Sequence, residues 1–161
     1  MKKLLNISSR LTVIVGIGLI VGGIWGIYFT YQSIARENIV TPLDASISGR
    51  PVRGPFTLMA QSDIIRHHTL TVTGNKTFAE MPRQIAKLDE KGQPVLDAEG
   101  KSVMVDNTAR DIWITATTLT TALNLGILTY ALSGLVILFG LTLILIGIIS
   151  GVLIRRVNFP S

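Results

Sequence analysis

Two adjacent histidines, His67 and His68, are the side chains best suited to metal or acid–base chemistry in this sequence. A metal site needs three or four converging ligands, and neighbouring residues on a helix point about 100° apart. No H-E-x-x-H pattern accompanies the pair. Asp63 precedes His67 by four residues, a spacing that favours an ion pair on one helix face. We therefore expect surface histidines and no metal site.

Four acidic residues between positions 89 and 99 could bind calcium or simply line solvated turns. They are Asp89, Glu90, Asp97 and Glu99. An EF-hand loop needs acids at alternate positions, then a glycine and a distal glutamate, and that spacing is absent. The segment is instead a repeat of eight residues, LDEKGQPV followed by LDAEGKSV. We predict the solvated turns of a short β-meander, with Gly92 and Gly100 at positive φ.

No further motif of enzymatic chemistry occurs in the sequence. It has no cysteine, no G-x-S-x-G, no glycine-rich phosphate loop, and no ionisable residue inside its long apolar stretches. An ionisable residue in such a stretch would mark a proton or ion path. We expect no catalytic residue, no cofactor and no enzyme activity, and the sequence identifies no small-molecule substrate.

Two long uncharged stretches dominate the chain of 161 residues, 25 residues from Leu11 to Ala35 and 43 from Ile112 to Ile154. A bilayer core of roughly 30 Å needs about 20 helical residues. The 76 residues between the stretches hold all ten acids and ten of the fifteen bases. This segregation excludes a soluble cytosolic enzyme, and two spans cannot enclose a channel. We predict a membrane α-helical fold: a two-helix transmembrane hairpin with a small α+β extracytoplasmic domain.

The predicted boundaries follow these stretches. The first span covers residues 11–31 and has its aromatic residues at the C-terminal end, as in an interfacial belt. Residues 112–154 form one long helix, in which an amphipathic, threonine-rich lead-in precedes the second span. Residues 32–111 are the extracytoplasmic domain, and residues 1–10 and 155–161 are the tails.

The charges of the two tails set the orientation. The cationic residues of the tails are Lys2, Lys3, Arg10, Arg155 and Arg156. They account for the net charge of +5, whereas the central segment is neutral. Short cationic tails stay in the cytoplasm, so we expect a two-pass protein of the plasma membrane with both termini inside. The pI of 9.9 then comes from the cationic tails, which we expect to lie near anionic lipid head groups. It does not indicate binding to nucleic acid.

A signal peptide cleaved after Ala35 is the alternative to a retained first span. The small-x-small triplet Ser33-Ile34-Ala35 follows an apolar run, as at a cleavage site. The apolar core of a signal peptide has about 7–15 residues, whereas this run has 21 and a bulky aromatic end. We therefore expect the span to be retained.

The central segment contains its own helix signals. Residues 36–55 hold three prolines and predict an extended passage. Residues 56–70 predict a helix that ends at Gly74-Asn75. Its apolar stripe is Phe56, Met59, Ala60 and Ile64.

Two more helix signals follow. Residues 77–88 predict a second short helix, limited by Pro82. The long helix is expected to start at the cluster of Asp106, Asn107 and Thr108, with Thr108-x-x-Asp111 as an approximate capping box.

Glycines four residues apart predict helix packing. Gly18, Gly22 and Gly26 line one stripe of the first span, which Gly16 and Gly23 flank. In the second span, Gly147 and Gly151 form another small-x-x-x-small pair, and Ser133 lies seven residues before a further glycine, Gly140. Without a Cβ, two helices approach closely. The helix-packing residues are therefore Gly18, Gly22, Gly26, Gly140, Gly147 and Gly151, and the sequence leaves open whether they contact each other or another protein.

Two motifs near residues 54–81 also suggest a family. With G-P-F-T-L-x-A-Q-x-D-I-I, G-x-K-T-F-A-E-M and the threonine-rich lead-in, most of the chain resembles small two-span membrane proteins of Actinobacteria. Members are often labelled aromatic ring-opening dioxygenase. That chemistry would need an iron site such as two histidines and a carboxylate, which His67 and His68 do not supply. The resemblance implies a Gram-positive-type envelope and brings no catalytic residues.

These features lead to two expectations of function. The first is a non-enzymatic accessory or assembly subunit, whose partners are lipids and other integral membrane subunits. By analogy with the small subunits of respiratory supercomplexes in such bacteria, electron transport is the expected setting. The alternative is a free-standing, membrane-anchored protein that binds a ligand or the envelope, which predicts a concave pocket in the outer domain.

Overall fold

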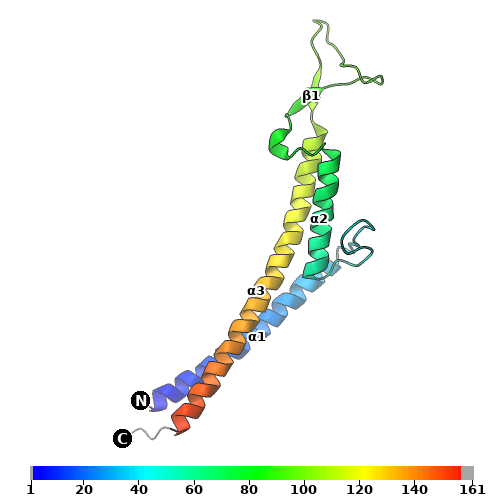
Figure 1. The fold of residues 1–161 in the computed structure, drawn as a ribbon. Coiled ribbons are helices and arrows are strands. Elements are labelled where there is room, and N and C mark those ends of the chain that lie inside the picture. Colours follow the sequence, from blue (N-terminus) through cyan, green and yellow to red (C-terminus); the bar gives the residue numbers. More distant parts are fainter. Residues whose placement is uncertain (1, 157–161) are drawn as a thin grey trace. The chain divides into compact units, whose positions relative to one another are not determined.

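The computed structural model describes residues 2–156, which are mostly helical (Figure 1). In chain order the elements are α1 (Lys2–Ala35), α2 (Pro55–Val72), the 3₁₀ turn η1 (Phe78–Glu80), β1 (Gln84–Ala86), β2 (Met104–Asp106) and α3 (Thr108–Arg156). Helices α1 and α3 are long and apolar enough to cross a membrane. The prediction of two such helices is thus confirmed by their length and composition. The structure also contains a small sheet of two strands.

The chain divides into two compact units. Of the described residues, the first unit contains 2–40, 50–58 and 125–156, and the second contains 41–49 and 59–124. Helix α3 contributes to both, because the boundary falls within it.

Helix α1 extends beyond the predicted first span at its N-terminal end. It begins at Lys2 and thus includes most of the predicted tail, because residues 2–10 contain no proline or glycine to interrupt it. It ends at Ala35, after which Asn38 takes a positive φ of 50°. An asparagine tolerates this left-handed conformation better than most residues do.

Helix α3 is a single helix of 49 residues, as the apolar pattern predicted. Asn107 caps its N-terminus, since its Oδ1 accepts a hydrogen bond of 3.1 Å from the backbone N–H of Ala109. The Asn107 Nδ2 also donates to the carbonyl of Pro82, at 3.0 Å. The predicted box of Thr108 and Asp111 was wrong, because the residue before Thr108 holds the capping position.

Helix α2 confirms the prediction for residues 56–70 and extends it slightly, to Pro55–Val72. The predicted apolar stripe was half wrong. Ala60 and Ile64 are buried, but Phe56 and Met59 are 76% and 51% exposed. Other buried positions of the helix include Leu58, Ser62 and Thr69. The buried face of α2 therefore mixes apolar and hydroxyl side chains, which a search for apolar periodicity does not detect.

The C-terminus of α2 follows the expected turn chemistry. Gly74 and Asn75 have φ angles of 63° and 59°, and the Asn75 N–H donates to the carbonyl of Leu70 at 2.7 Å. This bond satisfies a carbonyl that the end of the helix leaves free.

The predicted second helix over residues 77–88 is reduced to the single turn η1. Pro82 supplies no N–H to continue it, and β1 follows, paired antiparallel with β2. The turn is fastened to the start of α3, because the Arg110 guanidinium donates to the carbonyls of Phe78 and Met81, at 3.2 and 2.6 Å. Hydrogen bonds from Thr77 hold the pKa of the Glu80 carboxyl below its ordinary value.

The eight-residue repeat forms two turns of the same design. In each turn the aspartate Oδ1 accepts hydrogen bonds from backbone N–H groups two and four residues later, and the glycine three residues later has a positive φ. The turns use Asp89, Lys91, Gly92 and Gln93, then Asp97, Glu99, Gly100 and Lys101. The glycine φ angles are 76° and 78°, which confirms the prediction for both. These acids therefore organise turns.

Candidate functional site

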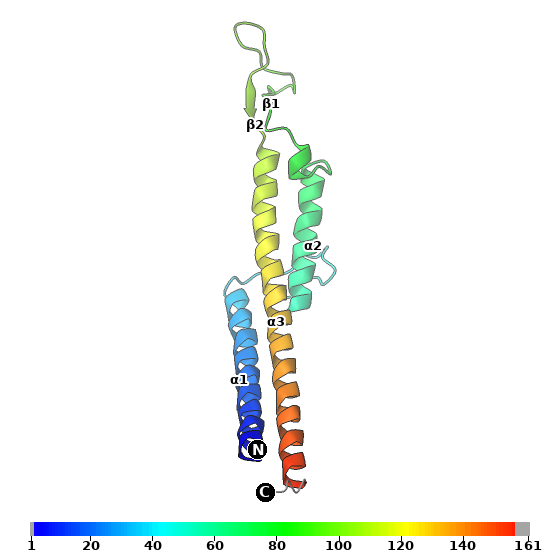
Figure 2. The ribbon, with the colours of Figure 1, turned by 90° about the vertical axis from the view of Figure 1, so that its left-hand side faces the viewer.

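Helix α1 and the part of α3 after Leu125 form the framework of the first unit. They lie side by side and antiparallel (Figures 1 and 2). Near one end of the pair, the buried Ser9 hydroxyl donates to the carbonyl of Gly147 at 2.7 Å. A side chain of one helix thus bonds directly to the backbone of the other, which requires a close approach.

Small residues seven apart line this contact on both helices. We call them the small-residue seam. Its members are Ser9, Gly16, Gly23 and Thr30 on α1, and Ser133, Gly140 and Gly147 on α3. All of them are buried. Residues seven apart drift by only about 20° around a helix, so each set remains on one face along the whole contact.

The seam brings the two backbones against each other at Gly16 and Gly140. A Cβ added to Gly16 would lie 2.6 Å from the Gly140 carbonyl oxygen, and a Cβ added to Gly140 would lie 2.6 Å from the Gly16 carbonyl oxygen. Similar crowding surrounds Gly23, where the Ser133 carbonyl oxygen is 2.8 Å away, and Gly147, where the Ser9 carbonyl oxygen is 2.9 Å away. Glycine is required at these four positions because no side-chain atom fits.

The structure separates the glycines that we predicted to pack. Gly140, Gly147 and Gly151 face α1, and the space beside Gly151 is limited by the Ser9 hydroxyl at 2.9 Å. Gly26 lies near the Ser133 hydroxyl, 2.6 Å from an added Cβ. In contrast, a Cβ on Gly18 or Gly22 would meet nothing within 4 Å.

The predicted stripe gives Gly16 and Gly23 only a flanking role, yet these are the two glycines of α1 at which an added Cβ would meet the backbone of α3. The signal that identifies them is the shared period of seven. Gly16 and Gly23 have this spacing on one helix, and Ser133, Gly140 and Gly147 have it on the other. A search for four-residue spacing selects Gly18, Gly22 and Gly26, which drift by about 40° at each step.

One of the two adjacent histidines, His68, pairs with a carboxylate on the surface of the second unit. His68 Nε2 lies 2.6 Å from the Asp44 carboxylate, and both side chains are about half exposed. We predicted that Asp63 would pair with His67, whereas the structure pairs Asp44 with His68. The pKa of Asp44 is lowered, chiefly by its hydrogen bond with His68. Residues 2–156 contain no group of three histidines or acids placed to hold a metal.

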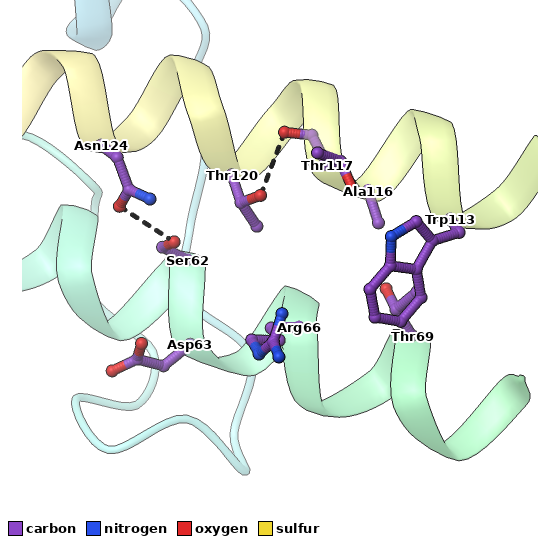
Figure 3. Close-up of a pocket in the computed structure, with 9 residues that line it drawn as sticks. All are labelled: Ser62, Asp63, Arg66, Thr69, Trp113, Ala116, Thr117, Thr120 and Asn124. Atoms are coloured by element: carbon purple, nitrogen blue, oxygen red, sulfur yellow. Dashed lines mark hydrogen bonds between the residues drawn. The ribbon is translucent and has the colours of Figure 1, made fainter. Parts of the chain in front are cut away.

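A polar groove runs between α2 and α3 in the second unit (Figure 3). Its volume is about 210 Å³, less than the roughly 300–1,000 Å³ of pockets for drug-sized ligands. The lining residues are Ser62, Asp63, Arg66, Thr69, Trp113, Ala116, Thr117, Thr120 and Asn124. The groove therefore suits a small polar group.

Hydrogen-bond donors surround this groove. Ser62 donates its hydroxyl to the Asn124 Oδ1 at 3.2 Å, which leaves the Asn124 amide nitrogen on the other side of that side chain (Figure 3). The Arg66 guanidinium lies 5.8 Å from the centre of the Trp113 ring, a cation–π distance. An aromatic face, a guanidinium and an amide, with the Asp63 carboxylate as an acceptor, together match a hydroxyl-rich ligand.

No known protein family, curated protein or solved structure matches this chain. A function for this chain therefore has to be inferred from its sequence and from the seam, the groove and the exposed surface.

Proposed function

We propose that this chain is a non-enzymatic accessory or assembly subunit of a larger bacterial membrane complex. In this proposal α1 and α3 cross the plasma membrane, with both termini in the cytoplasm and residues 32–111 outside. The cationic tails and the neutral middle segment support this orientation. The choice of a respiratory supercomplex as the partner rests on analogy with the small subunits of such complexes.

The observation that carries the proposal is the second glycine face of α1. The seam occupies one face of this helix, whereas Gly18 and Gly22 lie on open surface. In a bilayer, apolar surface is already solvated by lipid, so helix association depends on close packing and on hydrogen bonds. Glycines left open after the internal pair has formed suit a contact with a helix of another subunit.

The test is co-purification of wild type and the Gly22→Ile variant from native membranes. A C-terminal tag, mild detergent, a native gel and mass spectrometry identify what migrates with the chain. We expect Gly22→Ile to weaken co-purification while membrane insertion stays normal, because a Cβ added at this position meets nothing within 4 Å in this chain. The matched control is Gly134→Ile on α3, where an added Cβ also meets nothing within 4 Å.

Either outcome is informative. Migration of wild type with haem-containing oxidase or reductase subunits at fixed stoichiometry would support the supercomplex proposal. A lone species, or co-purification that Gly22→Ile and Gly134→Ile leave equally unchanged, would contradict the glycine-face contact.

The polar groove favours a second candidate, a membrane-anchored protein that binds an envelope glycan. Trp113 supplies an aromatic face, and Arg66 and Asn124 supply donors, which together suit a sugar. The probe is purified cell-wall polysaccharide, titrated against wild type and Trp113→Ala. Saturable binding that Trp113→Ala abolishes would favour this candidate, and no binding to wild type would remove it.

A further inference from the structure

Arg53 is held by two tyrosines in the first unit. Its Nη1 donates to the Tyr31 hydroxyl at 3.0 Å, and its guanidinium lies 5.8 Å from the centre of the Tyr31 ring. The Tyr130 hydroxyl donates to the Arg53 backbone carbonyl at 2.6 Å. Both the side chain and the backbone of Arg53 therefore have fixed positions between α1 and α3.

An apolar groove of about 410 Å³ begins at this arginine. Its walls are Ile24, Ile27, Tyr28, Tyr31, Gly54 and Tyr130. The volume lies within the roughly 300–1,000 Å³ of ligand pockets. The surface that lines this groove is almost wholly apolar, and the exposed residue Arg53 lies at its edge. A long apolar wall therefore borders one cation.

The Arg53 guanidinium has unused capacity for an anion. Among residues 2–156, no carboxylate forms an ion pair with it. A guanidinium carries five N–H donors in a planar fork that fits a phosphate bidentately, and the hydroxyl of Tyr31 accepts from Nη1 alone. Most of the donors are therefore available to a ligand.

We propose that this groove binds one anionic phospholipid, with the phosphate on Arg53 and an acyl chain along Ile24 and Ile27. The inference rests on the proposed membrane placement of α1 and α3. Tyrosines gather at the level of lipid head groups, and Tyr31 and Tyr130 flank the arginine. A partner helix in this groove would bury the guanidinium at high cost unless it brought an acid, whereas a phospholipid brings both the anion and the apolar chain.

The test measures lipid binding by native mass spectrometry of the purified full chain in detergent. Phosphatidylglycerol and phosphatidylcholine are titrated separately against wild type and Arg53→Gln. For wild type we expect one phosphatidylglycerol per chain, bound more tightly than phosphatidylcholine. Arg53→Gln should weaken phosphatidylglycerol binding about tenfold or more, since hydrogen bonds to a charged group are lost. Tyr31→Phe, which keeps the charge but removes the hydroxyl that holds Arg53, should weaken it less.

Arg36→Gln is the matched control, because it removes the same charge just after α1 without lining the groove. Equal weakening by Arg53→Gln and Arg36→Gln would overturn the proposal in favour of general attraction to the surface. Competition by inorganic phosphate as effective as that by the lipid would instead indicate a free-anion site. Co-purification of a protein lost in Arg53→Gln, with unchanged lipid binding, would indicate a partner helix.

The readout uses the isolated chain, so it does not depend on a partner complex. Loss of co-purification in Gly22→Ile with normal lipid binding would therefore leave this site standing, and the reverse result would leave the subunit proposal standing. Thermal unfolding of Arg53→Gln in the same detergent verifies that the variant is folded.

Discussion

Helix α3 packs in two different ways along its length. In the first unit it meets α1 through Gly140 and Gly147, with backbone against backbone. In the second unit it buries the side chains of Ala116 and Leu123, and Ala116 also lines the polar groove between α2 and α3. The first contact depends on the absence of side chains and the second on their presence.

The difference agrees with the two surroundings that we propose. Where lipid solvates the exterior, burying a leucine gains little, and close backbone approach and the Ser9 hydrogen bond provide the specificity. Where water solvates the exterior, burial of Leu123 stabilises the pair, and polar side chains remain at the edge. A single helix therefore follows two sets of packing rules.

The largest expected effect comes from filling the seam. Gly140→Leu would place a Cβ 2.6 Å from the Gly16 carbonyl oxygen and 2.8 Å from Ile20 Cγ1, so the helices must separate. We expect a loss of about 3 kcal/mol in the stability of the α1–α3 pair, at the upper end for overpacking. The measurement is oxidative cross-linking of a Ser9→Cys, Gly151→Cys pair, which is unambiguous because the natural chain has no cysteine.

The control for this prediction is Gly134→Leu, the same change on the same helix at an open position. With Gly134→Leu, the two introduced cysteines should cross-link as efficiently as they do in the chain without that change. Efficient cross-linking in Gly140→Leu would mean that the seam tolerates a side chain and would remove the contrast between the two contacts.

The opposite change should break the second contact. Leu123→Ala removes a side chain that is 8% exposed, and we expect a loss of about 2–3 kcal/mol, as for other truncations of buried leucines. Hydrogen exchange of the α2 amides measures it, because α2 packs on this part of α3 in the second unit. Leu119→Ala, at a position 50% exposed, should leave the exchange nearly unchanged. Equal effects of the two truncations would show that this contact is not governed by burial.

The smallest expected effect concerns the ion pair on the surface of the second unit. Asp44 has a lowered pKa in the folded chain because His68 hydrogen-bonds to it. A group of this kind contributes stability above its ordinary pKa of 3.8, and the contribution disappears as the pH falls through the lowered pKa of the folded chain. We therefore expect the 41–49 segment to lose protection from hydrogen exchange in acid, below about pH 4.

Asp44→Asn serves as the reference for that titration. It should lack the acid step, and the segment should be less protected at neutral pH. An acid step of the same size in Asp44→Asn would assign the titration to another group.

The sequence predicted the helices far better than their contacts. The apolar runs identified α1 and α3 because nearly any residue of a lipid-facing helix is apolar, and Gly74-Asn75 identified the end of α2 because only a few residue types accept positive φ. The faces were harder to predict. Phe56 and Met59 had the right spacing for a buried stripe but are exposed, since the buried face of α2 uses Ser62 and Thr69 as well.

The small-residue seam could be predicted only in part, for a related reason. Gly18 and Gly23 are chemically identical, and only the partner decides which of them is buried. That information lies some 110 residues further along the chain, in the seven-residue spacing of Ser133, Gly140 and Gly147. The polar groove could not be predicted at all, because its residues come from two helices and share no motif.

The twin turns at Asp89 and Asp97 have a consequence for how this chain varies over evolution. Each turn is closed by its own aspartate and its own glycine. One copy of the eight-residue repeat therefore contains every residue that its turn requires. Duplication or loss of one copy in the gene would change the reach of this segment without altering the helices on either side. Homologous genes should therefore differ here by insertions and deletions of twenty-four nucleotides or multiples of that length, roughly one copy at a time.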